Sequence, residues 1–178
     1  MKAKVIVYTS NTGYTAEYAR ILSRETGLLV YSLEQARKEL AAGSCILYLG
    51  WLMAGKVQGY DKAAKLYAVA AVCGVGMGAT GSQLEDVRRT NGIGQDIPVF
   101  TPQGGFDGKR LKGIYKMMMS VMAKTVGKKM AQKPNRTQEE DDMLDLLQNG
   151  GSRVKEDNLN ALLQWYYSDK AGERSPCL

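Results

Sequence analysis

The chain alternates short apolar runs with longer segments in which apolar residues recur every three or four positions. Runs rich in β-branched and aromatic residues indicate strands, and the amphipathic segments between them indicate helices. The run 45–50 is apolar on both faces, which is typical of a parallel strand that helices cover on each side. In chain order, strands are predicted at positions 4–8, 28–31, 45–50, 67–73 and 97–100. This alternation predicts an α/β fold, a doubly wound five-stranded parallel sheet with helices on both faces.

Start and stop signals delimit the helices between these strands. Gly27 ends the first helix, and Gly43 follows a second helix over about 33–42. Ser82, with Glu85 three residues later, predicts a capping box at the start of the fourth helix, which Asn91-Gly92 closes. The stretch 51–59 between the third strand and its helix is predicted to be a loop.

After the fifth strand the simple alternation stops. A long helical stretch is predicted over 111–130, and a capping box at Thr137 to Glu140 leads into a helix that continues over 142–147. The last helix is predicted over about 155–167. We therefore expect one domain over 1–170, with a helical insertion at about 108–150 and a disordered tail at 171–178.

The helix predicted over 111–130 is amphipathic. It could cover an edge of the sheet, wall a substrate pocket or meet a partner, or lie in a membrane interface with its lysines at anionic head groups. Its apolar side carries Leu111, Ile114, Tyr115, Met118, Val121, Met122 and Val126, and its basic side carries Lys112, Lys116, Lys124 and Lys128.

Composition narrows the chemistry further. The chain has 178 residues, 44% of them hydrophobic, which suits one domain with a proper core. It contains no histidine, which excludes Ser-His-Asp and Cys-His catalysis and disfavours a catalytic zinc. Cys45 and Cys73 lie in apolar runs and are expected to be reduced core residues. Chemistry is therefore expected from a bound cofactor, or from Tyr, Lys and carboxylates.

Charge and hydropathy bear on partners and location. A net charge of +6 suits an anionic ligand, a membrane surface or nucleic acid, but no nucleic-acid recognition motif is present, so we expect no nucleic-acid partner. No apolar run is long enough to cross a bilayer, and the N-terminus lacks the apolar region of a signal peptide. The expected location is the cytoplasm, with peripheral contact at the inner membrane face through the 111–130 helix as an alternative.

A loop suited to phosphate lies between the first strand and its helix. Its backbone N–H groups and the positive end of the helix converge on one spot, and Gly13 allows a tight turn around an anion. The loop lacks the lysine of a nucleotide-triphosphate loop, so a single monoester phosphate fits it better than ATP. The predicted phosphate-binding residues are Ser10, Asn11, Thr12, Gly13, Tyr14 and Thr15.

Two further loops are expected beside it, because ligands of open α/β sheets bind at the carboxyl ends of the strands. Trp51 offers a flat face for stacking, and glycines permit close backbone approach. The candidate residues after the third strand are Trp51, Leu52, Met53, Ala54, Gly55 and Lys56. Those after the fourth strand are Gly74, Val75, Gly76, Met77 and Gly78.

The pattern Ser-x-Thr-Gly-x-Thr over 10–15 resembles the phosphate loop of flavodoxins. The resemblance implies a sheet order of 2-1-3-4-5 and an FMN cofactor whose isoalloxazine ring lies between the two later loops. The chain is basic, whereas small electron-carrier flavodoxins are typically acidic. Gly104-Gly105-Phe106-Asp107 and the run Tyr115 to Met119, within the insertion, are similar to the flavodoxin-domain branch that includes menaquinone-dependent protoporphyrinogen oxidase.

The leading functional hypothesis is therefore an FMN-dependent oxidoreductase that passes electrons or hydride between FMN and a small planar or quinone-like substrate, as in protoporphyrinogen oxidation. The flavin supplies the core step, so no catalytic side chain is predicted. One alternative is a flavodoxin-type electron carrier that docks onto a redox partner and has no small-molecule substrate. Another is a module that binds a different phosphorylated ligand.

Overall fold

The computed structural model describes residues 3–111, 117, 121, 124–125, 127–128 and 131–171. Its centre is a sheet of five parallel strands in the order β2-β1-β3-β5-β6. A sixth strand, β4 (Lys56–Val57), pairs antiparallel with the end of β3. The parallel strands are β1 (Val5–Thr9), β2 (Leu29–Ser32), β3 (Cys45–Met53), β5 (Ala68–Val75) and β6 (Val99–Phe100). Without β4 this is the predicted order 2-1-3-4-5, so the flavodoxin-like α/β fold is confirmed.

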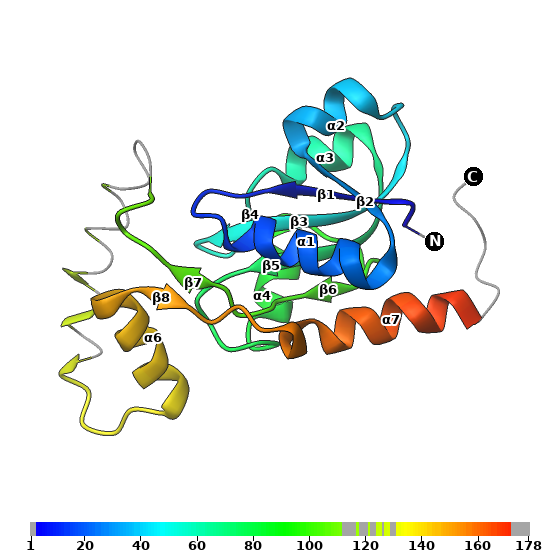
Figure 1. The fold of residues 1–178 in the computed structure, drawn as a ribbon. Helices are drawn as coiled ribbons and strands as arrows, with labels where there is room; N and C mark the ends of the chain where they lie inside the picture. The colour runs from blue at the N-terminus through cyan, green and yellow to red at the C-terminus, as the bar shows by residue number, and fades with distance from the viewer. Residues whose placement is uncertain are drawn as a thin grey trace.

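Helices cover both faces of the sheet, as predicted (Figure 1). On one face, α1 (Tyr14–Thr26) and α7 (Asn160–Ala171) pack on the sheet through Tyr18, Leu22 and Leu162. The other face is covered through Ala36, Ala63 and Val87. These three side chains belong respectively to α2 (Leu33–Glu39), α3 (Tyr60–Leu66) and α4 (Leu84–Asn91). The core is therefore two apolar layers, one on each side of the sheet.

The helix ends before β6 follow the predicted signals with two exceptions. The second helix, predicted over about 33–42 with Gly43 after it, ends earlier, because α2 stops at Glu39 and Leu40 is its C-cap. Gly27 and Gly92 adopt left-handed conformations at the C-caps of α1 and α4. The capping box at Ser82 is wrong, because α4 has Gln83 at its N-cap and no side chain caps it. The Ser82 hydroxyl instead donates to the Ala79 carbonyl, 2.7 Å away, so it closes the preceding turn.

The segments after β6 were only partly predicted. α6 (Gln138–Asn149) starts at the predicted capping box, where Thr137 and Glu140 exchange hydrogen bonds. A one-turn 3-10 helix, η1 (Glu156–Leu159), precedes α7, so the last helix starts later than predicted. The sequence pattern also missed a two-stranded antiparallel ribbon, β7 (Gly105–Phe106) with β8 (Gly151–Ser152).

Figure 1 places this ribbon and α6 together at the end of the sheet where β1 and β3 end. Most of the helix predicted over 111–130, and almost all of the tail at 171–178, lie outside the described residues. In the part of the chain that is described, no helix combines the length and the apolar character needed to cross a membrane.

Candidate functional site

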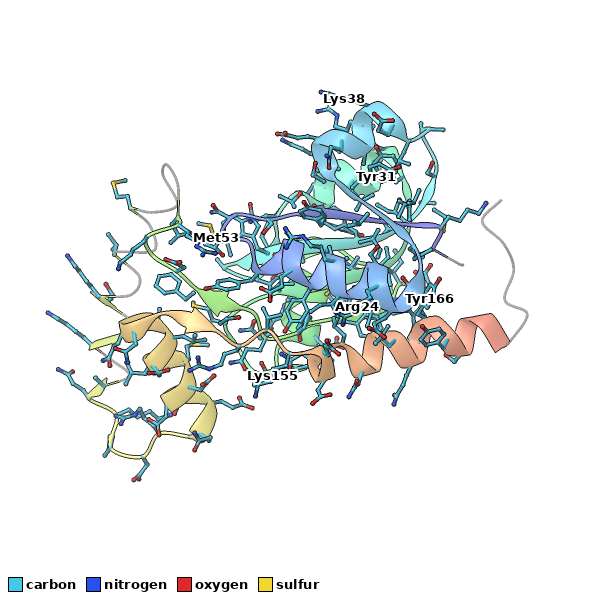
Figure 2. All side chains as sticks on the ribbon, in the orientation of Figure 1. Arg24, Tyr31, Lys38, Met53, Lys155 and Tyr166 are labelled. Atoms are coloured by element: carbon cyan, nitrogen blue, oxygen red, sulfur yellow. The ribbon has the colours of Figure 1, made fainter. Side chains whose placement is uncertain are left out.

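A cavity of about 410 Å³ lies at the carboxyl ends of β1, β3 and β5. The three predicted loops converge on it, as the rule for open α/β sheets requires. The predicted residues that line it are Asn11, Thr12, Tyr14, Thr15, Trp51, Leu52, Met53, Ala54, Gly55, Val75, Gly76, Met77 and Gly78. Figure 2 shows Met53 toward the side of the molecule that carries β7, β8 and α6, and Tyr166 on the opposite side.

The loop after β1 exposes uncapped helix donors to the cavity. Gly13, with φ of +105°, is the N-cap of α1, and no side chain caps the first turn. Its own N–H donates to the Ser10 hydroxyl at 3.2 Å, so Ser10 and Gly13 shape the loop and lie outside the cavity lining. The remaining first-turn N–H groups have no intrahelical acceptor, which is the arrangement that binds anions.

Three residues of this loop that line the cavity carry polar groups without a hydrogen-bond partner in the described part of the chain. The Asn11 Nδ2 atom is buried and has no hydrogen-bond partner. Such a group costs free energy unless something accepts its hydrogen bond. In the part of the chain that is described, no hydrogen bond engages the hydroxyl of Thr12 or of Thr15, and both residues line the cavity. The loop is therefore equipped with donors that the protein leaves unused.

The loop predicted after the third strand is a hairpin rather than an open loop. β3 continues to Met53 instead of ending at Gly50, and a two-residue turn leads into β4. Ala54 and Gly55 both have positive φ, +49° and +77°, as a tight hairpin turn requires. Lys56 points elsewhere: it pairs with Asp61 at 3.1 Å and does not line the cavity.

Glycines let the strand ends pack closely. A Cβ atom on Gly74 would lie 2.9 Å from a Leu52 methyl group, and one on Gly76 would lie 3.0 Å from the other. Gly74 is paired with Gly50 inside the sheet and does not line the cavity, whereas Gly76 does. The Leu52 side chain, on β3, can therefore pack directly over the two glycines, one in β5 and one just after it at the cavity.

Sequence reasoning missed a second wall of the cavity. It consists largely of apolar side chains that come from the ribbon and from α6. The lining residues that were not predicted are Gln83, Gly105, Phe106, Leu111, Met143 and Leu147. The Gly104-Gly105 pair and the capping box at Thr137 signalled local structure here, but no local pattern shows that the two segments meet.

Arg153 and Gln103 attach this wall to the rest of the protein. Arg153 pairs with Asp142 and Asp145 of α6. The Gln103 side chain donates to Asp142 Oδ2 at 2.6 Å and to the Met77 carbonyl at 3.1 Å. This side chain therefore links α6 directly to the loop after β5.

The Gln103 backbone is held from the other side by Tyr18 and Asn158. The Tyr18 hydroxyl donates to the Gln103 carbonyl, and Asn158 Nδ2 donates to the same carbonyl at 3.1 Å and to the Tyr18 oxygen at 2.7 Å. Burial raises the pKa of Tyr18, so it stays protonated and can donate. These hydrogen bonds fix the Gln103 backbone to α1 and η1.

A positive charge lies beside the loop after β1. The Arg110 Nη1 atom is 3.9 Å from where a Cβ on Gly13 would be, and Arg110 also pairs with Asp107 at 3.2 Å. Partial burial and the Asp107 carboxylate raise the pKa of Tyr14, while Arg110 acts in the opposite direction. Arg110 adds a cation to a loop that has none of its own.

Comparison of the chain with protein-family models, with curated proteins and with solved structures found no significant match in any of the three. A flavodoxin-like sheet carries a cavity with an anion-suited helix start at one end and a largely apolar interior. Uncapped N–H groups at a helix start and an apolar cavity thus lie side by side at the strand ends.

Proposed function

We propose that the chain binds FMN in this cavity and acts as an FMN-dependent oxidoreductase. The observation that carries the proposal is the buried Asn11 Nδ2 atom, which has no partner, at an uncapped helix start that opens into a cavity at the strand ends. An anionic ligand would accept this hydrogen bond and those of the free N–H groups.

The residues present fit FMN. Thr12, Thr15 and the first turn of α1 would hold the phosphate, with Arg110 adding charge from beside Gly13. The ring would lie against Trp51, the Ala54–Gly55 turn and Val75 to Gly78, which all line the cavity. When bound, FMN supplies hydride and electron transfer.

The chain's own contribution is binding, orientation and exclusion of water. Phe106, Met143 and Leu147 make the wall apolar, and a dry site strengthens every polar contact made inside it. No side-chain base is needed. Cys73 is fully buried and its pKa is raised by burial, so its thiol is inert.

The same apolar wall favours a small-molecule oxidoreductase over an electron carrier. A carrier that docks onto a redox partner needs an exposed ring edge, whereas Phe106 and α6 extend the cavity beyond the three loops. We propose a planar or quinone-like substrate, with protoporphyrinogen oxidation as the example drawn from the resembling branch. Peripheral membrane contact through the 111–130 helix remains a sequence-based prediction.

The decisive measurement is a titration of the purified protein with FMN and, separately, with riboflavin. We expect perturbed flavin absorption that stays with the protein through gel filtration, and tighter binding of FMN because only FMN carries the phosphate. Thr15→Val and Thr12→Val should each weaken FMN binding by about 1–3 kcal/mol while leaving riboflavin binding unchanged.

Thr26→Val, at the other end of α1, is the matched control and should change neither affinity. If FMN binds no more tightly than riboflavin, or both Thr variants bind FMN normally, the phosphate site is wrong.

Reduced holoprotein should be reoxidised by soluble quinones under anaerobic conditions. Retained FMN with no reaction towards any small acceptor would favour the electron carrier instead.

A further inference from the structure

Gln83 lies at the start of α4 and brings a side-chain amide to the cavity. It is the N-cap residue of the helix, but its side chain makes no capping hydrogen bond. Within the described part of the chain, no hydrogen bond engages this amide, and Gln83 lines the cavity. A primary amide has an oxygen that accepts hydrogen bonds and an NH₂ group that donates them. Gln83 therefore offers an unused acceptor and unused donors to a ligand.

Two glycines of the loop after β5 make room for this amide. A Cβ on Gly78 would lie 3.2 Å from Gln83 Cδ and 3.3 Å from Nε2, and a Cβ on Gly76 would lie 3.6 Å from Oε1. Neither glycine has a positive φ, so these positions call for glycine because of space rather than backbone conformation. Both glycines line the cavity, so the amide packs against the loop backbone at the cavity wall.

The amide and the anion-suited loop after β1 serve different parts of a ligand. Strand β3 lies between β1 and β5. Because neighbouring strands are about 4.8 Å apart, the ends of β1 and β5 are separated by about 10 Å. Among the described lining residues outside the loop after β1, Gln83 alone carries a side-chain amide. A ligand whose anion lies at the start of α1 therefore meets Gln83 with a second, uncharged polar group.

We propose that Gln83 is a specificity-determining residue that recognises the imide edge of the flavin ring. This inference rests on the proposed function. In an imide edge a carbonyl oxygen stands beside an N–H, and one primary amide can donate to the first and accept from the second. The opposite, hydrocarbon edge of the ring forms no such bonds and is suited to apolar side chains such as Phe106 and Met143. Gln83 thus turns the polar edge of the ring toward α4.

The test compares the dissociation constants of FMN and of an FMN derivative methylated on the imide nitrogen, which lacks that N–H. The full wild-type chain should bind FMN at least about fivefold more tightly, as expected for one lost hydrogen bond. Gln83→Met, of similar length but without an amide, should bind the two flavins almost equally. Gln83→Asn should also lose the preference, because its amide is one methylene shorter, while asparagine is a favourable N-cap that keeps α4 stable.

Gln58→Met is the matched control, because Gln58 follows β4 and does not line the cavity. It should keep the full preference for FMN. A preference that persisted in Gln83→Met would assign recognition of the imide N–H to other groups and overturn the inference, although FMN binding itself stood. Equal binding of both flavins by the wild-type chain, or an equal loss of preference in Gln58→Met, would overturn it as well. Failure of the wild-type chain to bind FMN would instead overturn the proposed function and this inference with it.

Discussion

The two walls of the cavity are built in different ways. The sheet wall is formed by the loops after β1, β3 and β5, and strand pairing and the buried Asn91 amide hold it. The second wall consists of side chains on the β7–β8 ribbon and α6. Arg153 attaches it through Asp142 and Asp145, and these side chains are 26%, 30% and 47% exposed.

This difference separates two tasks. A wall held by buried hydrogen bonds opens only when the sheet opens, so it can keep a ligand in a fixed place. A wall held by half-exposed ion pairs costs little free energy to displace, because such pairs contribute little to stability in water. The sheet wall is therefore the part expected to keep its shape, and the second wall is the part expected to move first.

The largest expected effect comes from Gly105→Ala, which strains the second wall and its contact with Tyr14. The added Cβ would clash with the Gly151 carbonyl oxygen and lie 2.8 Å from Tyr14 Cζ, so the ribbon must separate. We expect the free energy of opening β7, β8 and α6 to fall by roughly 2–3 kcal/mol. Faster amide hydrogen exchange over 138–152, with unchanged exchange in β1, β3 and β5, would show this.

Gly108→Ala is the matched control for that experiment. Its Cβ would be 3.7 Å from the Phe106 ring, an ordinary contact, so exchange should stay as in the wild-type chain. If amide exchange in the sheet strands of the Gly105→Ala variant were accelerated equally, the two walls would open together. The proposed difference between the walls would then be wrong.

The sheet wall could be predicted from sequence because each part of it is local. The run 45–50 marks a buried strand by itself, and Gly13 marks the turn from the first strand into its helix. Strand order and helix placement then followed from the handedness of βαβ units and the resemblance to flavodoxins.

The rest depends on contacts between residues far apart in sequence. Phe106 meets Gly151 across the ribbon, and Asn91 meets Gly55 across 36 positions, and neither pairing leaves a periodic pattern. The Ser82 error has a local cause: a serine hydroxyl can close a preceding turn as readily as cap a following helix, and here it bonds to Ala79.

Ala54→Gly tests the sheet wall with a smaller effect. Ala54 has φ of +49°, a left-handed conformation that costs an alanine about 1 kcal/mol and a glycine almost nothing. Relief of this strain should raise the free energy of unfolding by roughly 0.5–1 kcal/mol, measured by urea denaturation. Ala42→Gly, where φ is not positive, should lower it instead. A loss of stability in Ala54→Gly would mean that the turn is not strained.

The smallest effect concerns the attachment of the second wall and its dependence on pH. Hydrogen bonds from Asn149 and Arg153 lower the pKa of Asp145 below its ordinary value. A depressed carboxyl pKa stabilises the folded state above the unfolded pKa of about 4, and this contribution disappears as pH falls through the folded pKa. The attachment should therefore be complete at neutral pH and weaken below about pH 4.

Arg153→Gln isolates this contribution from other effects of acid. At neutral pH we expect α6 to exchange its amide protons faster in the variant than in the wild-type chain, with no difference in the sheet. The difference should shrink as pH falls below about 4, because protonated Asp145 no longer pairs with Arg153 in either protein. Arg24→Gln, which loses its pairs with Glu25 and Glu156 away from the cavity, should leave α6 unchanged at every pH. A difference in α6 exchange that persisted unchanged in acid would mean that Arg153 holds the wall by packing rather than by charge.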